Sequence, residues 1–139
     1  MNRGTSSGAA VAGRLRDAIT RHDLEAMTGC FAPDFVNETP VHPARSFTGR
    51  DQVRKNWAQI FAAVPDLTAE LLACAEDGET VWAEWQMSGT RRDGAAHLMR
   101  GVSVLKVKDD LFQSVRFYLE PVEHGGPGID GAVREGLSR

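Results

Sequence analysis

The stretch from Thr80 to Val122 constrains the fold most, because it holds three strand-like runs separated only by tight-turn signals. The first run alternates two sets of side chains, as a strand with two different faces does. The more apolar set is Val81, Ala83, Trp85 and Met87. Asp93-Gly94 and Asp109-Asp110 supply the turns after the first and second runs. The pattern predicts an antiparallel meander.

The third run, Phe112 to Val122, has two sharply different rows of side chains. One row is apolar and consists of Val115, Phe117 and Leu119; the other consists of Ser114, Arg116, Tyr118 and Glu120. Alternation alone favours the apolar row as the one that faces the protein interior. A β-bulge within the run would reverse this and turn the polar row inward. The sequence leaves both orientations open.

Helical patterns and two further strands precede this meander. Helices are expected from Val11, after Asp23 as N-cap, and after Thr48, where the spacing to Asp51 is that of a capping box. The third helix is the longest and has the apolar stripe Val53, Trp57, Ile60, Phe61 and Val64. Strands are expected at Phe35–Thr39 and Leu67–Cys74. This order predicts an α+β fold in which a curved antiparallel sheet wraps around the long helix and leaves a pocket between them.

Length and composition limit the organisation and the partners. The 139 residues predict one domain at 11–122, a disordered arm at 1–10 and a flexible glycine-rich tail at 123–139. A net charge of −3 and the lack of a basic stripe argue against nucleic acid or an anionic membrane as partner. With no apolar run of 18 residues, we expect a cytoplasmic protein. Cys30 and Cys74 are expected to be buried free thiols, and neither their spacing nor their surroundings suggest a metal site.

Several short motifs together resemble the SnoaL-like branch of the nuclear transport factor 2-like superfamily. The resemblance covers roughly residues 11–122, and its motifs are Gly49-Arg50-Asp51 with Trp57, Val64-Pro65-Asp66-Leu67, Asp77-Gly78, Gly89-Thr90 and Arg100-Gly101-Val102. It implies a cone-shaped α+β fold and a homodimer formed through the outer face of the sheet. Members include polyketide cyclases, a ketosteroid isomerase, a limonene epoxide hydrolase and non-catalytic modules.

Two of these activities lack their functional residues here. The isomerase pattern has a tyrosine and two aspartates at positions that match Leu15, Thr39 and either Val102 or Ser103. Without those carboxyl groups, nothing at these positions can move the proton or donate to an oxyanion. The epoxide hydrolase pattern has an arginine and two aspartates near positions that hold Trp85, Met87 and Phe117. Neither activity is expected.

The cyclase pattern matches better. In the cyclases an aspartate near the end of the last strand is the acid or base of an intramolecular aldol ring closure, and the resemblance places Glu120 there. It also matches Asn37 to an asparagine that contacts the substrate, while Arg116 replaces a cyclase tryptophan. The leading hypothesis is therefore a cofactor-independent cyclase or isomerase acting on a hydrophobic, polyketide-like molecule.

The candidate site residues follow from this hypothesis. Glu120 would move the proton, Asn37 and Tyr118 would orient a carbonyl or enol, and His42 would carry protons at the cavity mouth or be a solvated loop residue. The expected substrate contacts are Trp57, Phe61, Met87, Trp85, Ser103 and Arg116. The alternative from another class is a dimeric module that binds a small apolar ligand without chemistry. That alternative predicts a pocket with no carboxylate inside it. Separately, the alternation of the last strand would place Arg116, Tyr118 and Glu120 on the outer face as dimer contacts or solvated groups.

Overall fold

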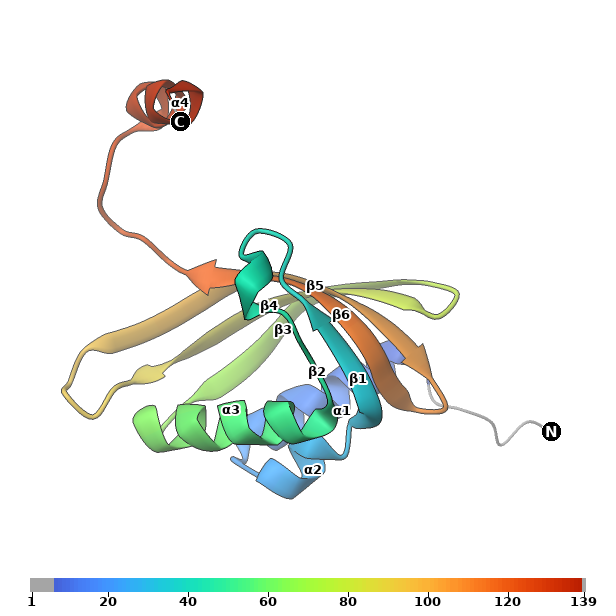
Figure 1. The fold of residues 1–139 in the computed structure, drawn as a ribbon. Coiled ribbons are helices and arrows are strands. Elements are labelled where there is room, and N and C mark those ends of the chain that lie inside the picture. Colours follow the sequence, from blue (N-terminus) through green and yellow to red (C-terminus); the bar gives the residue numbers. More distant parts are fainter. Residues whose placement is uncertain (1–6, 139) are drawn as a thin grey trace.

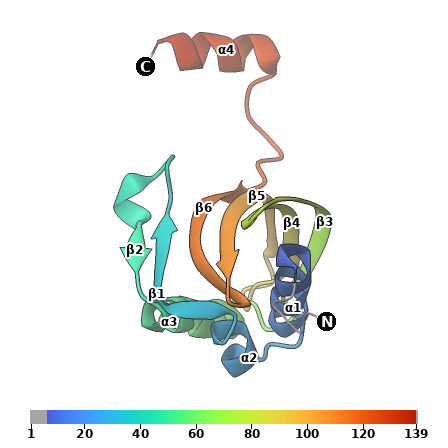
Figure 2. The same cartoon turned by 90° about the vertical axis from the view of Figure 1, so that its right-hand side faces the viewer.

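A six-stranded mixed sheet forms the frame of the protein in the computed structural model, which describes residues 7–138 (Figure 1). The strands lie in the order β2-β1-β6-β5-β4-β3, and within the described residues only the β1–β6 pair is parallel. Their bounds are β1 Phe31–Glu38, β2 Phe47–Thr48, β3 Thr68–Asp77, β4 Thr80–Thr90, β5 Ala96–Lys108 and β6 Leu111–Pro121. The sheet curves around the helices, which confirms the predicted α+β class (Figure 2).

The C-terminal half of the sheet is the predicted meander. Strands β4 and β5 pair without interruption from Thr80 opposite Lys106 to Thr90 opposite Ala96. Asp109 and Asp110 connect β5 to β6 with φ values of 55° and 62°. Two consecutive positive φ angles are the requirement of a type I′ hairpin turn, which Asp and Asn tolerate better than most residues. The turn signals in the sequence therefore predicted these connections correctly.

The apolar row of β6 faces inward. Val115 and Leu119 are buried, whereas Arg116 is exposed and Tyr118 retains 37% of its accessible surface. The pairing of β5 with β6 is regular from Met99 opposite Pro121 to Lys106 opposite Ser114, so no bulge reverses the alternation over this part of the strand. The polar row consequently lies on the outer face of the sheet. The homodimer that the resemblance implies through this face stays a prediction.

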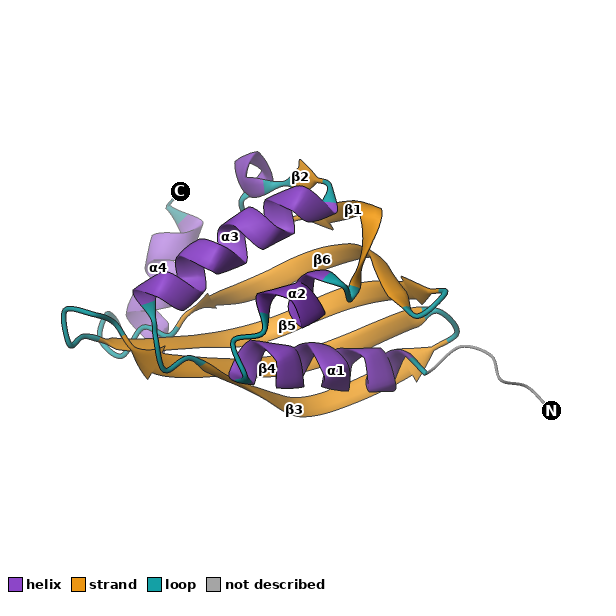
Figure 3. Ribbon diagram, turned by 90° about the horizontal axis from the view of Figure 1, so that it is seen from below, coloured by secondary structure: helices purple, strands orange, loops and turns teal. Residues whose placement is uncertain are grey.

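Three helices cover the inner face of the sheet (Figure 3). They are α1 (Gly8–Thr20), α2 (Leu24–Thr28) and α3 (Arg50–Ala63), and α2 lies between the other two. The predicted cap of α2 is confirmed, because Asp23 Oδ1 accepts a hydrogen bond of 3.0 Å from the Ala26 amide. Helix α1 packs closely on the sheet and buries Val11, Leu15 and Ile19 among its side chains.

Helix α3 differs from the prediction in two ways. Thr48 belongs to β2, and Gly49 is the N-cap, with φ of 103° and no side-chain cap bond, so the capping box does not form. Val53 is the only fully buried residue of the helix, while Trp57, Ile60 and Phe61 are partly buried. A helix that packed flat on the sheet would bury its whole apolar stripe. Part of the stripe of α3 instead borders an open space.

Strand β1 is longer than predicted. It begins at Phe31 rather than Phe35, and Pro33 lies where its register against β6 shifts, between Phe31 and Val36. Proline cannot donate to a ladder and is tolerated at such an irregularity. Cys30, just before the strand, is buried as expected, and burial raises the pKa of its thiol. Cys74 is exposed on β3, so the prediction of a buried pair is wrong for this residue.

Helical structure extends further toward both ends of the described residues than the sequence predicted. Residues 1–6 of the predicted disordered arm lie outside the described residues, but Gly8–Ala10 form the first turn of α1, where the Ser7 side chain caps the Ala10 amide. In the tail, α4 (Ile129–Leu137) is a helix rather than a single turn. It stands away from the sheet, on the side opposite α1–α3 (Figures 1 and 2). Its apolar residues Ile129, Val133 and Leu137 are exposed.

Candidate ligand-binding cavity

A cavity of about 250 Å³ lies between α3 and the inner face of the sheet. Side chains from α1, α2, α3 and five strands line it, and most of them are apolar. The aliphatic and aromatic part of the lining includes Leu15, Met27, Phe35, Trp57, Leu105 and Leu119. The volume is slightly below the range of about 300–1,000 Å³ that is typical of small-molecule sites. The cavity therefore suits a compact, largely apolar molecule.

The curvature that leaves this space depends on Gly101 in the middle of β5. Its φ is 152°, and a Cβ atom there would lie only 2.2 Å from the carbonyl oxygen of Tyr118 on β6. No other residue type can bring the two backbones so close, because a side chain would occupy the same space. Glycine positions of this kind let a sheet bend sharply. Gly101 thus contributes to the shape of the cavity although it does not line it.

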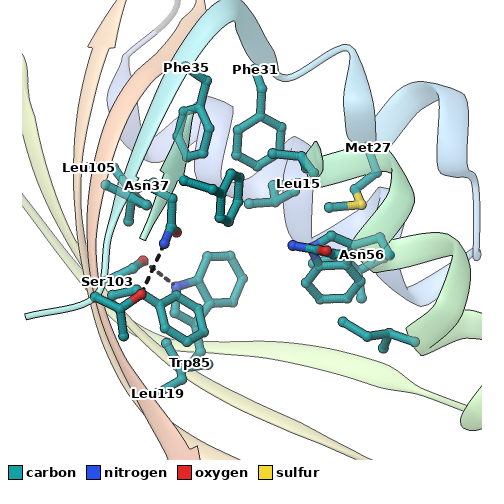
Figure 4. A pocket seen from close by; sticks show the side chains of 18 of the residues that line it. Leu15, Met27, Phe31, Phe35, Asn37, Asn56, Trp85, Ser103, Leu105 and Leu119 are labelled. Atoms are coloured by element: carbon teal, nitrogen blue, oxygen red, sulfur yellow. Dashed lines mark hydrogen bonds between the residues drawn. The ribbon is translucent and has the colours of Figure 1, made fainter. Parts of the chain in front are cut away.

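One wall of the cavity carries two buried hydrogen bonds (Figure 4). Trp85 Nε1 donates to Ser103 Oγ over 2.8 Å, and Asn37 Nδ2 donates to Thr39 Oγ1 over 3.0 Å. Both hydroxyl oxygens thereby serve as acceptors. Within residues 7–138 neither hydroxyl group donates a hydrogen bond in return, so each proton is available to a molecule in the cavity. The two hydroxyl groups of this wall are therefore potential hydrogen-bond donors toward a ligand.

Two further polar side chains complete the lining. Asn56 of α3 lies across the cavity from this wall, and its Oδ1 accepts from Gln52 Nε2 over 2.8 Å (Figure 4). Because this hydrogen bond uses only the oxygen of the Asn56 amide, its N–H groups can still donate to a ligand. In the described part of the chain, Arg45 of the β1–β2 loop is the only ionisable residue in the lining, and it is exposed, so it lies where the cavity meets solvent. No aspartate or glutamate of residues 7–138 lines the cavity.

Half of the predicted site residues meet in this cavity. Asn37, Trp57, Trp85, Met87 and Ser103 all line it. Trp85, Met87 and Ser103 are there because they lie on the inward-facing rows of β4 and β5, and Trp57 because its face of α3 borders the open space. The apolar walls and the amide that the sequence suggested are thus brought together.

The other predicted site residues do not line the cavity. Arg116, Tyr118 and Glu120 belong to the outward row of β6, so the expectation that a carboxylate projects into the cavity is not met. Phe61 is on α3 but stacks on His22, with ring centroids 4.5 Å apart, and so points away from the lining. The physical reason in β6 is the unbroken period of two, which cannot place Leu119 and Glu120 on the same face.

His42 and Glu120 contact one another instead. His42 Nε2 lies 3.0 Å from Glu120 Oε1, and both side chains are partly exposed, at 34% and 47%. His42 belongs to the loop between Thr39 and Arg45, the two residues of this connection that reach the cavity. The contact ties that loop to the end of β6. The Glu120 carboxylate thus contacts this loop and does not line the cavity.

Sequence reasoning did not single out Thr39, Asn56 or Arg45 as site residues. Thr39 could have been found, because it follows Asn37 by two positions and so shares its face. Asn56 and Arg45 carry no such signal, since an amide on a polar helix and an arginine in a proline-containing loop are both common on surfaces. Their place in the lining comes only from the packing of α3 and of the β1–β2 loop.

Among residues 7–138 no three His, Cys, Asp or Glu side chains are grouped closely enough to hold a metal ion. Within the same residues every helix is too short or too polar to cross a lipid bilayer.

The curved mixed sheet with helices on its inner face is the fold of solved proteins described as NTF2-like and as ketosteroid isomerase-like. The model of the SnoaL-like domain matches residues 12–115, and the chain belongs to this family. The resemblance inferred from its motifs is thus confirmed. No curated protein matches the sequence.

Solved structures share this fold at low sequence identity. IdmH of Streptomyces antibioticus, a candidate polyketide cyclase, is 20% identical, with a TM-score of 0.70 over 81% of this chain and 91% of that one. A protein of Catenulispora acidiphila with a ketosteroid isomerase-like fold, solved with trimethylamine, is 18% identical, with a TM-score of 0.66 over 81% of this chain and 87% of that one. A candidate isomerase of Bacillus subtilis is 17% identical, with a TM-score of 0.71 over 81% and 85%. These likenesses concern the fold.

Proposed function

We propose that the protein binds a small, largely apolar molecule that carries a carbonyl group or a similar hydrogen-bond acceptor. The observation that carries this proposal is the composition of the cavity wall. Over the described residues its lining is apolar and free of carboxylates, and the hydroxyl protons of Ser103 and Thr39 are available for donation. A buried hydrogen-bond donor without an acceptor carries a free-energy penalty. A ligand that supplies an acceptor at this wall should therefore bind more tightly than one that does not.

The strength of this preference can be bounded. A neutral hydrogen bond contributes about 0.5–1.5 kcal/mol net, which corresponds to roughly two- to thirteenfold in affinity. Each hydroxyl already accepts a hydrogen bond, and such chains polarise the donor and strengthen it modestly. We therefore expect a ketone to bind about tenfold more tightly than the hydrocarbon of the same shape.

The test compares 2-acetonaphthone with 2-ethylnaphthalene, which differ in the carbonyl oxygen, by isothermal titration calorimetry. The native protein should prefer the ketone, and Thr39→Val, which keeps the side-chain shape, should reduce that preference, although it also removes the acceptor of Asn37 Nδ2. Ser103→Ala should act in the same direction, although it also removes the acceptor of Trp85 Nε1. Equal affinities for the two compounds, or no binding of either, would contradict the proposal.

A second candidate function, cyclisation or isomerisation of a polyketide-like intermediate, is favoured by the donor wall together with the apolar enclosure. Two donors at one carbonyl can stabilise an enolate whose α-proton passes to solvent water at the cavity entrance, and holding a flexible chain in one conformer accelerates ring closure without a positioned carboxylate. In this candidate function the hydroxyl groups of Ser103 and Thr39 stabilise the enolate, and Glu120 serves only to hold the β1–β2 loop. Glu120→Gln should then leave ligand affinity within about twofold of the native value, since amide and carboxylate can both bond His42. A complete loss of turnover, with binding intact, would restore Glu120 as the proton carrier.

A further inference from the structure

The positive charge of Arg45 at the cavity entrance indicates which chemical class of ligand the cavity binds, an inference that rests on the proposed binding function. Arg45 is the only ionisable side chain among the described residues that line the cavity, and no carboxylate of this lining balances it. Among residues 7–138 its guanidinium forms no ion pair and donates no side-chain hydrogen bond. An unpaired cation therefore stands at the edge of an otherwise neutral, apolar space.

The loop that carries Arg45 is held in place. The Arg45 amide donates to the His42 carbonyl over 2.9 Å, and the Ser46 side chain accepts from the Thr39 amide over 3.0 Å. The His42–Glu120 contact fixes the same loop to β6. Pro43 at the start of the short 3-10 turn restricts the backbone further. The backbone of the loop that carries Arg45 is thus anchored, so less backbone entropy is lost when the side chain of Arg45 binds a ligand.

We propose that the ligand is an amphiphilic acid whose carboxylate binds Arg45 while its apolar body fills the cavity. A guanidinium presents paired N–H groups that match the two oxygens of a carboxylate, and such charge-assisted hydrogen bonds are stronger than neutral ones. Burial of the apolar part of the ligand against the apolar walls contributes favourably to binding. The hydroxyl groups of Ser103 and Thr39, which are buried, can donate to an acceptor atom of the ligand. An acid with a second oxygen, such as a keto acid, can bind Arg45 with its carboxylate and accept a hydrogen bond from Ser103 or Thr39 with the other oxygen.

The experiment measures the affinities of 2-naphthylacetic acid and 2-naphthylacetamide, which have the same size but differ in charge. The native protein should bind the acid about tenfold more tightly than the amide, equivalent to about 1.4 kcal/mol. Arg45→Gln should abolish this difference while leaving amide binding nearly unchanged. Arg116→Gln, which makes the same change in net charge on the outer face, is the matched control and should preserve the difference. Added salt should weaken acid binding only.

The outcomes separate this inference from the proposed function. Equal binding of acid and amide by the native protein would overturn the inference and leave the proposed function standing. Equal losses for both probes in Arg45→Gln would also overturn it, because they would show a structural role for the arginine. If neither probe binds while 2-acetonaphthone does, the acid class is wrong. If none of these compounds binds, the proposed function itself fails.

Discussion

Replacing Gly101 with valine is expected to destabilise the protein by about 3–5 kcal/mol, enough to remove much of the stability of an ordinary domain. Two costs combine at this position. The φ of 152° is one that residues with a side chain avoid, which costs about 1–3 kcal/mol. A Cβ atom would also lie 2.2 Å from the Tyr118 carbonyl oxygen and 2.7 Å from the Leu119 Cα, so β5 and β6 would have to separate.

Urea denaturation followed by circular dichroism measures this loss. Gly78→Ala is the matched control, because Gly78 also has a positive φ, of 60°, but a Cβ atom there meets nothing within 4 Å. The control should cost only about 1–2 kcal/mol, the penalty of the backbone conformation alone. If both variants lose the same small amount, the close approach of β5 and β6 is not what the fold requires.

Filling the cavity is the second change with a large expected effect. Leu119→Trp places an indole at a position that lines the cavity, and we expect the affinity for 2-acetonaphthone to fall at least about tenfold. Overpacking a closed core costs about 1–3 kcal/mol, but an existing cavity can take up part of the added volume. The free energy of unfolding should therefore change by less than about 2 kcal/mol.

Leu119→Met keeps the side-chain volume and is the control for this variant, so it should bind the ketone within about threefold of the native protein. Calorimetric titration of both variants gives the affinity for 2-acetonaphthone, and urea denaturation gives the free energy of unfolding. Unaltered ketone binding by Leu119→Trp would show that the ligand does not occupy the space between α3 and the sheet.

Local patterns predicted the parts of the fold that depend on neighbouring residues. The period of two in β4 and β6, the Asp109-Asp110 turn and the Asp23 cap all concern contacts within a few residues, and each formed as expected. The capping box failed because Thr48 pairs with Val36 in the sheet, a contact that the local sequence does not reveal. The parallel pairing of β1 with β6 is also non-local, since it joins residues more than seventy positions apart.

In the candidate site too, local sequence patterns predicted some residue positions, whereas non-local packing determined others. For Glu120, the family resemblance and the alternation of β6 indicated opposite faces, and the position follows the alternation because the pairing with β5 stays in register. Trp85, Met87 and Ser103 could be placed from their strands alone. Arg45 and Asn56 could not, because they reach the cavity only after the β1–β2 loop and α3 have packed. The residues that most define the proposed ligand are therefore those that sequence patterns describe least.

The incompletely filled interior has a thermodynamic consequence of its own. A molecule that enters the space beside α3 restores dispersion contacts that the native protein alone does not make, and it binds the folded chain in preference to the unfolded one. Saturation at a hundred times the dissociation constant would add about 2.7 kcal/mol, which raises the melting temperature of a chain of this length by roughly 5–15 °C. Thermal denaturation in the presence of a metabolite library can therefore reveal the natural occupant through heat resistance alone, whether or not a reaction follows binding.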